Sequence, residues 1–338
     1  MLKAKRMAAA AAVLLLLTGM LAACGSRQGG TSGQSTAAEP SGQPSTPAAA
    51  EQSAFPLKVK DSTGYEMTID KKPKAIVSLT LGTDEMLLSL VDGSRIKALS
   101  GKIAEDDGIS NIADRAGAFL KAENNLELVI SLKPDIVFAA DWMRKEGIQQ
   151  MRDAKIPVYC YKTANSIEEQ KSTLMEIARV VGEEAKGREI VEDMDKRINA
   201  VEEKVKTLKP EERLTVLSYN SYGSTSSKGT TFDDIVTRAG LINAAAQAGL
   251  EPNAQISKEK IVEINPDVLF LPLWSYDKKQ DPAAFADEIR KDKSLASVKA
   301  VKNNRIYLLP DKHMSAISQY IALGVEDAAK AAYPQLFK

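Results

Sequence analysis

A thirteen-residue segment that occurs twice constrains the fold of this chain more than any other feature. One copy runs from Leu126 to Phe138 and the other from Lys258 to Phe270, 132 positions further along. In each copy a glutamate opens a short helical stretch, and a Pro-Asp pair seven residues later ends it and begins an apolar strand. Solenoid repeats recur about every 20 to 50 residues, so this wider spacing predicts two similar lobes.

Strands and helices alternate around both copies. Strand-like runs cover residues 75–79 and 214–219, and helical patterns follow at residues 83–91 and 232–239. Such alternation predicts an α/β fold whose mainly parallel sheets are covered on both faces. Ahead of the first lobe, residues 57–69 alternate apolar and polar side chains around a turn-forming segment, which predicts a β-hairpin.

Two helices are predicted between the lobes. The first covers residues 166–181, and the second, over residues 183–208, places apolar side chains three or four positions apart: Ile190, Met194, Ile198, Val201 and Val205. About 25 helical residues reach about 38 Å, which is enough to bridge two lobes. The expected organisation is a lobe over residues 54–182, a linking helix over 183–208 and a lobe over 209–338. The alternative is a core helix within one lobe.

The first 23 residues have the pattern of a secretory signal. Lys3, Lys5 and Arg6 precede an apolar run that is too short to span a bilayer comfortably. Residues 21–24, Leu-Ala-Ala-Cys, resemble the bacterial lipobox, in which the cysteine receives a diacylglyceryl group and becomes the mature N-terminus. Cys24 is therefore the predicted lipidation site. The alternative is ordinary signal cleavage beside an incidental cysteine.

Residues 24–53 are predicted to form a flexible tether, because they are almost wholly small or polar. Lys+Arg and Asp+Glu both total 45, so no basic excess is present to hold nucleic acid or an anionic membrane surface. Attachment to the extracytoplasmic face of the cell membrane is expected to come from the lipid. The second cysteine, Cys160, lies in an apolar strand-like run and is predicted to be a buried, inert thiol.

Several motifs together resemble the solute-binding proteins of the iron-siderophore, haem and vitamin B12 ABC importers. They are the hairpin entry, residues 74–79 leading into Thr83-Asp84-Glu85, the two Glu-to-Pro-Asp units, the long linking helix, and Phe232-Asp233-Asp234-Ile235 before Ala239-Gly240 and Asn243. The resemblance covers the whole mature chain. It implies two Rossmann-like lobes facing each other across a shallow cleft, joined by one long helix that limits closure to small angles.

The resemblance implies a role for two glutamates, and the repeat itself draws attention to two tryptophans. Glu127 and Glu259 match the glutamates that pair with arginines of the permease, although either could simply complement a helix dipole. Trp142 and Trp274, the only two tryptophans, each follow a repeat proline by eight residues. Because ligands of open α/β sheets bind beyond the carboxyl ends of strands, both indoles are candidate ligand contacts. The alternative is that each plugs its own lobe.

Other candidates follow predicted strands and could meet an anionic chelate: Ser100, Gly101, Lys102, Arg144, the run from Tyr219 to Tyr222, and Lys228. Each could equally be an exposed solubilising group. His313 follows the strand-like residues 306–309 and could ligate a haem iron, but an ordinary loop histidine is the simpler interpretation.

No constellation predicts an enzyme. A single histidine without a Cys-x-x-Cys pair argues against a zinc or manganese site, and residues 223–230 depart from a phosphate loop at Ser227 and Gly229. The expected function is capture of a ferric siderophore and its delivery to an ABC permease and its ATPase, with no cofactor. Cobalamin or haem binding, a non-transport sensor on the same fold, and an extracytoplasmic enzyme are the alternatives.

Overall fold

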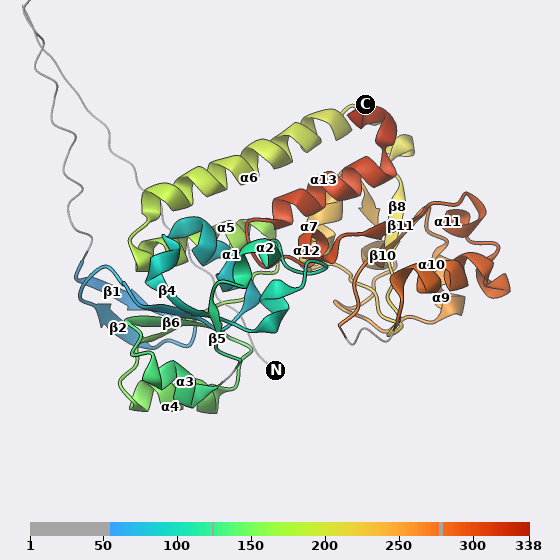
Figure 1. The fold of residues 1–338 in the computed structure, drawn as a ribbon. Helices are drawn as coiled ribbons and strands as arrows, with labels where there is room; N and C mark the ends of the chain where they lie inside the picture. Colours follow the sequence, from blue (N-terminus) through green and yellow to red (C-terminus); the bar gives the residue numbers. More distant parts are fainter. Residues whose placement is uncertain (1–54, 124, 277–279) are drawn as a thin grey trace, which may run out of the picture. The chain divides into compact units, whose positions relative to one another are not determined.

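The computed structural model describes residues 55–123, 125–276 and 280–338 (Figure 1). The predicted signal, Cys24 and tether lie outside the described residues. The first described element is an antiparallel hairpin of β1 (Leu57–Lys60) and β2 (Glu66–Ile69). Its turn is closed by Asp61, whose Oδ1 accepts from the Thr63 and Tyr65 backbone N–H groups at 2.8 and 3.0 Å. The predicted hairpin is confirmed.

The first lobe contains a sheet of five parallel strands in the order β5-β4-β3-β6-β7. These strands are β3 (Ile76–Ser78), β4 (Ile96–Leu99), β5 (Leu120–Lys121), β6 (Ile136–Ala140) and β7 (Val158–Tyr161). The helices that connect them are α1 (Leu81–Leu90), α2 (Ala113–Ala116), α3 (Leu126–Ser131), α4 (Lys145–Asp153) and α5 (Ile167–Val181).

Alternate residues of these strands point to opposite faces, and both faces are buried. Ile76 and Ile136 pack with side chains of α1 and α5, whereas Val77 and Val137 pack with side chains of α3 and α4. The result is a three-layer α/β/α arrangement, as the alternating pattern predicted. Cys160 on β7 is fully buried, and burial raises the pKa of its thiol, which agrees with the predicted inert role.

The second lobe repeats this architecture with four parallel strands in the order β11-β10-β8-β9. They are β8 (Thr215–Ser218), β9 (Ile242–Asn243), β10 (Val268–Pro272) and β11 (Ile306–Leu309). Its helices are α7 (Thr231–Arg238), α8 (Ala244–Gln247), α9 (Lys258–Ile264), α10 (Pro282–Lys291), α11 (Lys299–Lys302), α12 (Asp311–Met314) and α13 (Ile321–Ala332). One face packs on α7 and α13, and the other packs on α9 and α10.

The two repeats become α3 with β6 and α9 with β10, so the predicted helix–turn–strand units are confirmed. The aspartate after each proline has the same task. Asp135 Oδ2 accepts from the Lys74 and Ala75 backbone N–H groups at 2.8 and 3.0 Å, just before β3. Asp267 Oδ2 accepts from the backbone N–H and hydroxyl of Thr215 at 3.0 and 2.8 Å, at the start of β8.

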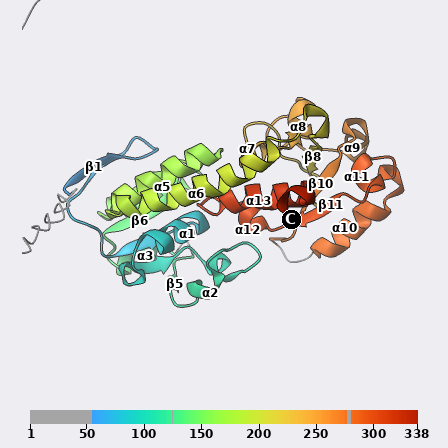
Figure 2. The ribbon, with the colours of Figure 1, turned by 90° about the horizontal axis from the view of Figure 1, so that it is seen from above.

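Helix α6 (Glu184–Val205) is the predicted linking helix, and it spans about 33 Å at 1.5 Å per residue. Ile190 and Val191 pack against the core of the first lobe, whereas the buried residues from Met194 to Val205 belong to the core of the second. α5 and α13 lie alongside it (Figure 1, Figure 2). The helix is three residues shorter at its carboxyl end than predicted, because residues 206–208 form a turn before Pro210.

Besides α6, further segments make contacts between the lobes. Ile167, the first residue of α5, has its side chain in the second core, and its backbone N–H donates to Asp234 Oδ2 at 2.7 Å. Residues 315–320 return from the second lobe to α1. There the Gln319 Nε2 donates to the Glu85 carbonyl at 3.2 Å, and a Cβ on Gly82 would lie 2.4 Å from the Ile317 carbonyl oxygen.

Candidate ligand-binding cleft

The loops that follow the parallel strands of both lobes line two cavities. Leu79 follows β3, Ser100 follows β4 and Trp142 follows β6, and all three line the first cavity. Tyr219 follows β8 and Asp311 follows β11, and both line the second. Carboxyl ends of parallel strands are the usual ligand-binding edge of α/β sheets.

The first cavity has a volume of about 520 Å³ and takes its walls from both lobes. Trp142, Lys102 and Tyr161 come from the first lobe, and Tyr276 comes from the second. Its remaining lining residues are Leu79, Thr80, Leu81, Gly82, Glu85, Ser100, Gly101, Ile103, Ile109, Glu123, Ser315, Ala316 and Ile317. Trp142 is 66% exposed and Tyr276 is 76% exposed, so both rings offer uncovered faces.

The second cavity, of about 390 Å³, lies mainly on the second lobe and shares Ser315 and Ile317 with the first. Thr163, Ala164 and Asn165 contribute to it from the first lobe. The shared residues belong to the segment 315–320 that returns to α1. The two cavities therefore form one cleft with a common wall between the lobes, and its size is that of ordinary ligand sites.

Buried carboxylates support the walls of this cleft. Glu85 is 2% exposed, and its Oε1 accepts from the Asn111 backbone N–H and Nδ2 at 2.8 and 2.9 Å, while Ser318 Oγ donates to its Oε2. Burial raises the pKa of Glu85, although these hydrogen bonds oppose the shift. Asn111 Nδ2 also donates to the Lys312 carbonyl at 2.7 Å, so this group ties α1 to the second lobe.

Asp311 supports the loop that follows β10. Its Oδ2 accepts from the backbone N–H groups of Leu273 and Trp274, both at 2.8 Å. Burial raises the pKa of Asp311 to about 6, although these hydrogen bonds oppose the shift. The carboxylate thus fixes the direction in which the Trp274 side chain leaves the sheet.

Four predicted ligand contacts line the first cavity together: Ser100, Gly101, Lys102 and Trp142. Trp274 follows its strand as expected, but its indole reaches the opposite lobe, where Nε1 donates to Asp106 Oδ2 at 3.1 Å. It lines neither cavity of the cleft. Of the two tryptophans, only Trp142 lines a cavity of the cleft, and ligand contact through it stays a prediction.

Tyr219 and Asn220, from the predicted run after β8, line the second cavity, whereas Arg144, Tyr222 and Lys228 line neither cavity. Arg144 precedes α4 as its N-cap residue, and Tyr222 and Lys228 are exposed in the loop after β8. Their neighbours Asn220, Ser224 and Ser226 do line the second cavity. In the loop after β8, Tyr219 and the smaller polar residues line the cavity, and Tyr222 and Lys228 do not.

His313 lies in the short helix α12, where its Nδ1 is 2.6 Å from Asp327 Oδ2 on α13. It lines neither cavity. Its simplest role is to pair α12 with α13. Within the residues that the structure describes, no group of three or more His, Cys, Asp or Glu side chains could hold a metal ion, and no helix is long and apolar enough to cross a membrane.

Sequence reasoning missed Tyr276, Asp311, Glu85 and the segment 315–317. Tyr276 and Asp311 follow strands β10 and β11, so the rule that singled out Trp274 could have found them. Glu85 stands within a helical pattern, where a charged residue is expected on the solvent side. Nothing in the sequence of residues 315–317 indicates that they cross to the other lobe.

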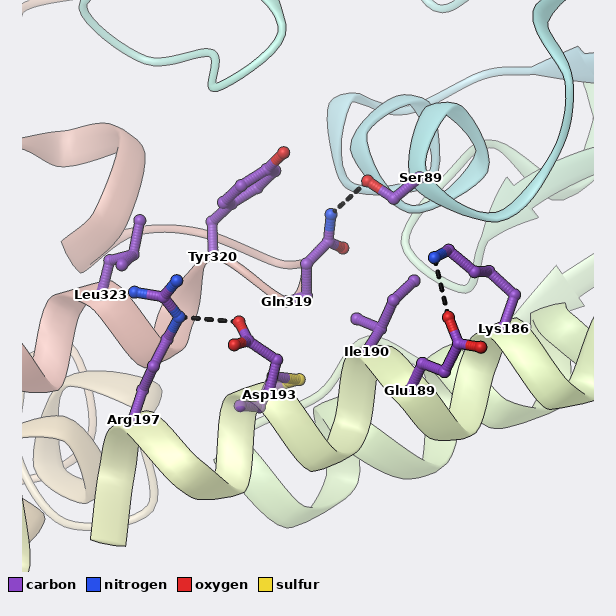
Figure 3. Close-up of a pocket in the computed structure, with 10 residues that line it drawn as sticks. Ser89, Lys186, Glu189, Ile190, Asp193, Arg197, Gln319, Tyr320 and Leu323 are labelled. Carbon is purple, nitrogen blue, oxygen red and sulfur yellow. Dashed lines mark hydrogen bonds and ion pairs between the residues drawn. The ribbon is translucent and has the colours of Figure 1, made fainter. Parts of the chain in front are cut away.

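A third cavity, of about 400 Å³, lies among α1, α6 and α13 (Figure 3). Its charged side chains are already paired: Lys186 Nζ lies 2.8 Å from Glu189, and Arg197 Nε lies 2.7 Å from Asp193. Its lining residues belong to these helices and to the segment just before α13, and none follows a strand. We therefore place the candidate site in the cleft.

Glu127 and Glu259 occupy matching positions in the two lobes. Each lies in the first turn of its helix, α3 or α9, and each is exposed. The helices are capped by Asn125 and Ser257, whose side chains accept from the Leu128 and Lys260 backbone N–H groups at 3.0 and 3.2 Å. Neither helix therefore needs its glutamate as the N-cap residue, although interactions with the Glu259 backbone N–H and with Ser257 lower the pKa of Glu259.

Comparisons with known proteins agree with this architecture. The ABC transporter substrate-binding lipoprotein YvrC of Bacillus subtilis is 28% identical over 94% of this chain and 95% of its own length. The iron-uptake system-binding protein of the same organism is 26% identical over 87% of each chain. The solved structure of the molybdate-binding protein MolA of Haemophilus influenzae shares the fold, with a TM-score of 0.68 at 22% identity, over 83% of this chain and 92% of that one.

The family model described as periplasmic binding protein matches residues 76–313. That range begins at β3 and ends within α12, so it contains both sheets, α6 and the loops of the cleft up to residue 313. The chain therefore belongs to the periplasmic binding protein family.

Proposed function

We propose that this protein is the solute-binding lipoprotein of an ABC importer, and that it captures a ferric siderophore in the cleft and delivers it to the permease. Family membership and the names of relatives such as YvrC and the iron-uptake system-binding protein support the importer role. The permease and its ATPase are the proposed partners. Lipid on Cys24 is the proposed membrane anchor.

The observation that carries the ligand class is the pair of aromatic rings in the first cavity. Trp142 and Tyr276 come from different lobes, line the same cavity and are 66% and 76% exposed. Large exposed aromatic side chains are costly to leave in water and effective at covering a broad, partly apolar ligand. A chelate that fills the cleft would cover both rings at once, which links ligand binding to the relative position of the lobes.

The charges of the cleft favour a chelate of low net charge. Lys102 is the cation that lines the first cavity, and the carboxylates of Glu85 and Glu123 line it as well. Asp311 lines the second cavity. A strongly anionic ligand would meet these carboxylates without a compensating group of arginines. Ferric trihydroxamates, which are neutral or singly positive, therefore fit better than ferric catecholates, which carry several negative charges.

We propose that docking to the permease uses the rims of the lobes, by which we mean the exposed surfaces around Glu127 on α3 and Glu259 on α9, and not the cleft. Glu127 and Glu259, one in each lobe, present exposed carboxylates that can pair with cationic side chains of a permease. The repeat places the same charge at the same site of each lobe, which suits a permease with two similar halves. Capture and docking would then depend on different residues.

Native mass spectrometry of the full chain in detergent tests the ligand class. The probes are ferrioxamine B as a trihydroxamate, ferric enterobactin as a catecholate, cobalamin, haem and molybdate, each titrated separately. We expect a one-to-one complex with ferrioxamine B at the lowest concentration, together with quenching of tryptophan fluorescence. Binding of cobalamin, haem or molybdate with no siderophore complex would overturn the ferric siderophore assignment and keep the binding-protein role. A chain that binds none of the five would refute both.

A further inference from the structure

Trp274 and Asp106 join the two lobes at the side of the cleft. Trp274 lies in the loop after β10 of the second lobe, and Asp106 lies in the loop after β4 of the first. The indole Nε1 donates to Asp106 Oδ2 at 3.1 Å, while Asp106 Oδ1 accepts from the Gly108 backbone N–H at 3.1 Å. One carboxylate thus holds both its own loop and the tryptophan of the opposite lobe.

The indole is fixed from its own lobe as well. The backbone N–H groups of Leu273 and Trp274 donate to Asp311 Oδ2, and the ring of Tyr276 packs edge-on against the indole with centroids 6.0 Å apart. A continuous series of contacts therefore runs from α12 of the second lobe, through Trp274, to the Asp106 loop of the first. Ordered contacts on both sides distinguish this side chain from a ring that only covers its own lobe.

Space is made for the indole by Gly108. A Cβ at this position would lie 2.4 Å from Trp274 Cδ1, closer than nonbonded atoms approach. The same loop supplies Ile103 and Ile109 to the first cavity, and Tyr276 lines that cavity from the other lobe. The contact between Trp274 and Asp106 thus closes the cleft beside the first cavity.

We propose that Trp274 is an interlobe clasp, whose bond to Asp106 sets the width of the cleft and whose release admits or frees a ligand. Trp142 offers the comparison: it lines the first cavity and is 66% exposed, whereas Trp274 lines neither cavity and donates to Asp106 of the opposite lobe. The two indoles have different roles in this proposal. Trp142 faces the ligand, and Trp274 controls the opening. This inference does not depend on which ligand the cleft takes.

The first experiment measures how accessible the Trp274 indole is to solvent. Because the chain has two tryptophans, Trp142→Phe leaves Trp274 as the only one, in the otherwise full chain. Adding Asp106→Ala or Gly108→Ala should raise the acrylamide quenching constant at least twofold and shift the emission to longer wavelength. Asp107→Ala removes the exposed neighbouring carboxylate of the same loop and should change neither. Circular dichroism confirms that each variant is folded.

The second experiment measures the distance between the two lobes. Spin labels are placed at Gln150 on α4 and Ala284 on α10, both exposed, in the full chain carrying Cys24→Ser; Cys160 is buried and stays unlabelled. Without ligand, Trp274→Phe keeps an aromatic ring but loses the N–H donor, and it should broaden the distance distribution toward longer distances. Trp142→Phe should leave the distribution unchanged. Equal distributions for the two variants, or unchanged quenching in both loop variants, would overturn the clasp.

Discussion

Asp135 and Asp267 are equivalent residues of the two lobes: each follows the repeat proline, and each accepts two hydrogen bonds at the entry to the neighbouring strand. Asp135 thereby anchors β3, and Asp267 anchors β8. Each carboxylate also lies near a lysine, Lys71 at 4.0 Å or Lys299 at 3.1 Å. The Pro-Asp pair is thus retained in both copies as the joint between a helix–turn–strand unit and the central strand of its sheet.

Removing either carboxylate should destabilise the fold. Asp267→Ala leaves two donors of Thr215 without their acceptor, at a cost of about 1–3 kcal/mol of unfolding free energy, and Asp135→Ala should cost less because its side chain is more exposed. Asp267→Asn keeps an acceptor and is the matched control. Urea unfolding measures all three. An alanine variant as stable as the asparagine variant would contradict the anchoring role.

The buried Asp84 on α1 makes stability depend on pH. Burial raises its pKa to about 6, although hydrogen bonds from Ser100 and Ser78 oppose the shift. Just below pH 6, the folded state therefore holds a proton that the unfolded chain has already lost. The stabilisation that this proton gives the folded state is present at low pH and is lost as the pH rises through about 6. Asp84→Asn, which does not ionise, should gain stability relative to the natural chain between pH 5 and pH 8, by on the order of 1.4 kcal/mol. Urea unfolding at both pH values tests this, and an equal difference at the two values would contradict it.

Charge reversal at the rims should separate docking from capture. Glu127→Lys with Glu259→Lys should lower uptake of radiolabelled ferrioxamine B by tenfold or more, because attraction to a cationic permease surface becomes repulsion. Affinity of the isolated chain for the same probe should stay within about twofold, since neither residue lines the cleft. Glu146→Lys with Glu251→Lys reverses one exposed charge in each lobe elsewhere and should leave uptake normal. Normal uptake by the first pair of changes would refute docking through the repeat glutamates.

Capture itself should depend on the two rings that line the first cavity. Trp142→Ala and Tyr276→Ala should each weaken binding of ferrioxamine B by about tenfold, which corresponds to about 1.4 kcal/mol of lost contact. Tyr222→Ala removes another exposed aromatic ring, one that lines neither cavity, and should have a smaller effect. Isothermal titration calorimetry gives the three affinities. Equal losses at all three positions would show that cavity lining does not identify the contacts.

Membrane attachment should depend on Cys24. Cys24→Ser removes the acyl acceptor, so the chain should appear unprocessed or be released into the medium. Metabolic labelling with a palmitate analogue, followed by fractionation, measures both outcomes. Ser26→Ala, two positions on, is the control and should be labelled normally. A Cys24→Ser protein that stays in the membrane fraction with its signal removed would contradict lipid anchoring.

Much of the fold could be predicted because it depends on local patterns. Apolar periodicity located α5 and α6, and the predicted start of α5 at Ser166 is its N-cap residue, whose hydroxyl accepts from the Glu169 N–H. The repeat located α3 with β6 and α9 with β10. Each of these signals lies within about 20 consecutive residues, where spacing alone reports which side chains share a face.

The site was predicted less well because its walls meet across the lobes. The Trp274–Asp106 bond joins positions 168 residues apart, and the Ser318–Glu85 bond joins positions 233 apart. Neither pair leaves a periodic mark in the sequence. The rule on strand ends selected Trp142, which lines the first cavity, and the loops of Trp274 and Tyr222, but it could not tell which side chains of a loop line a cavity.

The position of Ile167 has a consequence for how the molecule loses its structure. Its helix covers the first sheet, yet its side chain completes the core of the second lobe, and its N–H is bound to Asp234. Neither half can unfold without exposing part of the other half's interior. Heating should therefore give one cooperative transition rather than two. Although the two lobes share a repeated unit, neither has a complete core without the other.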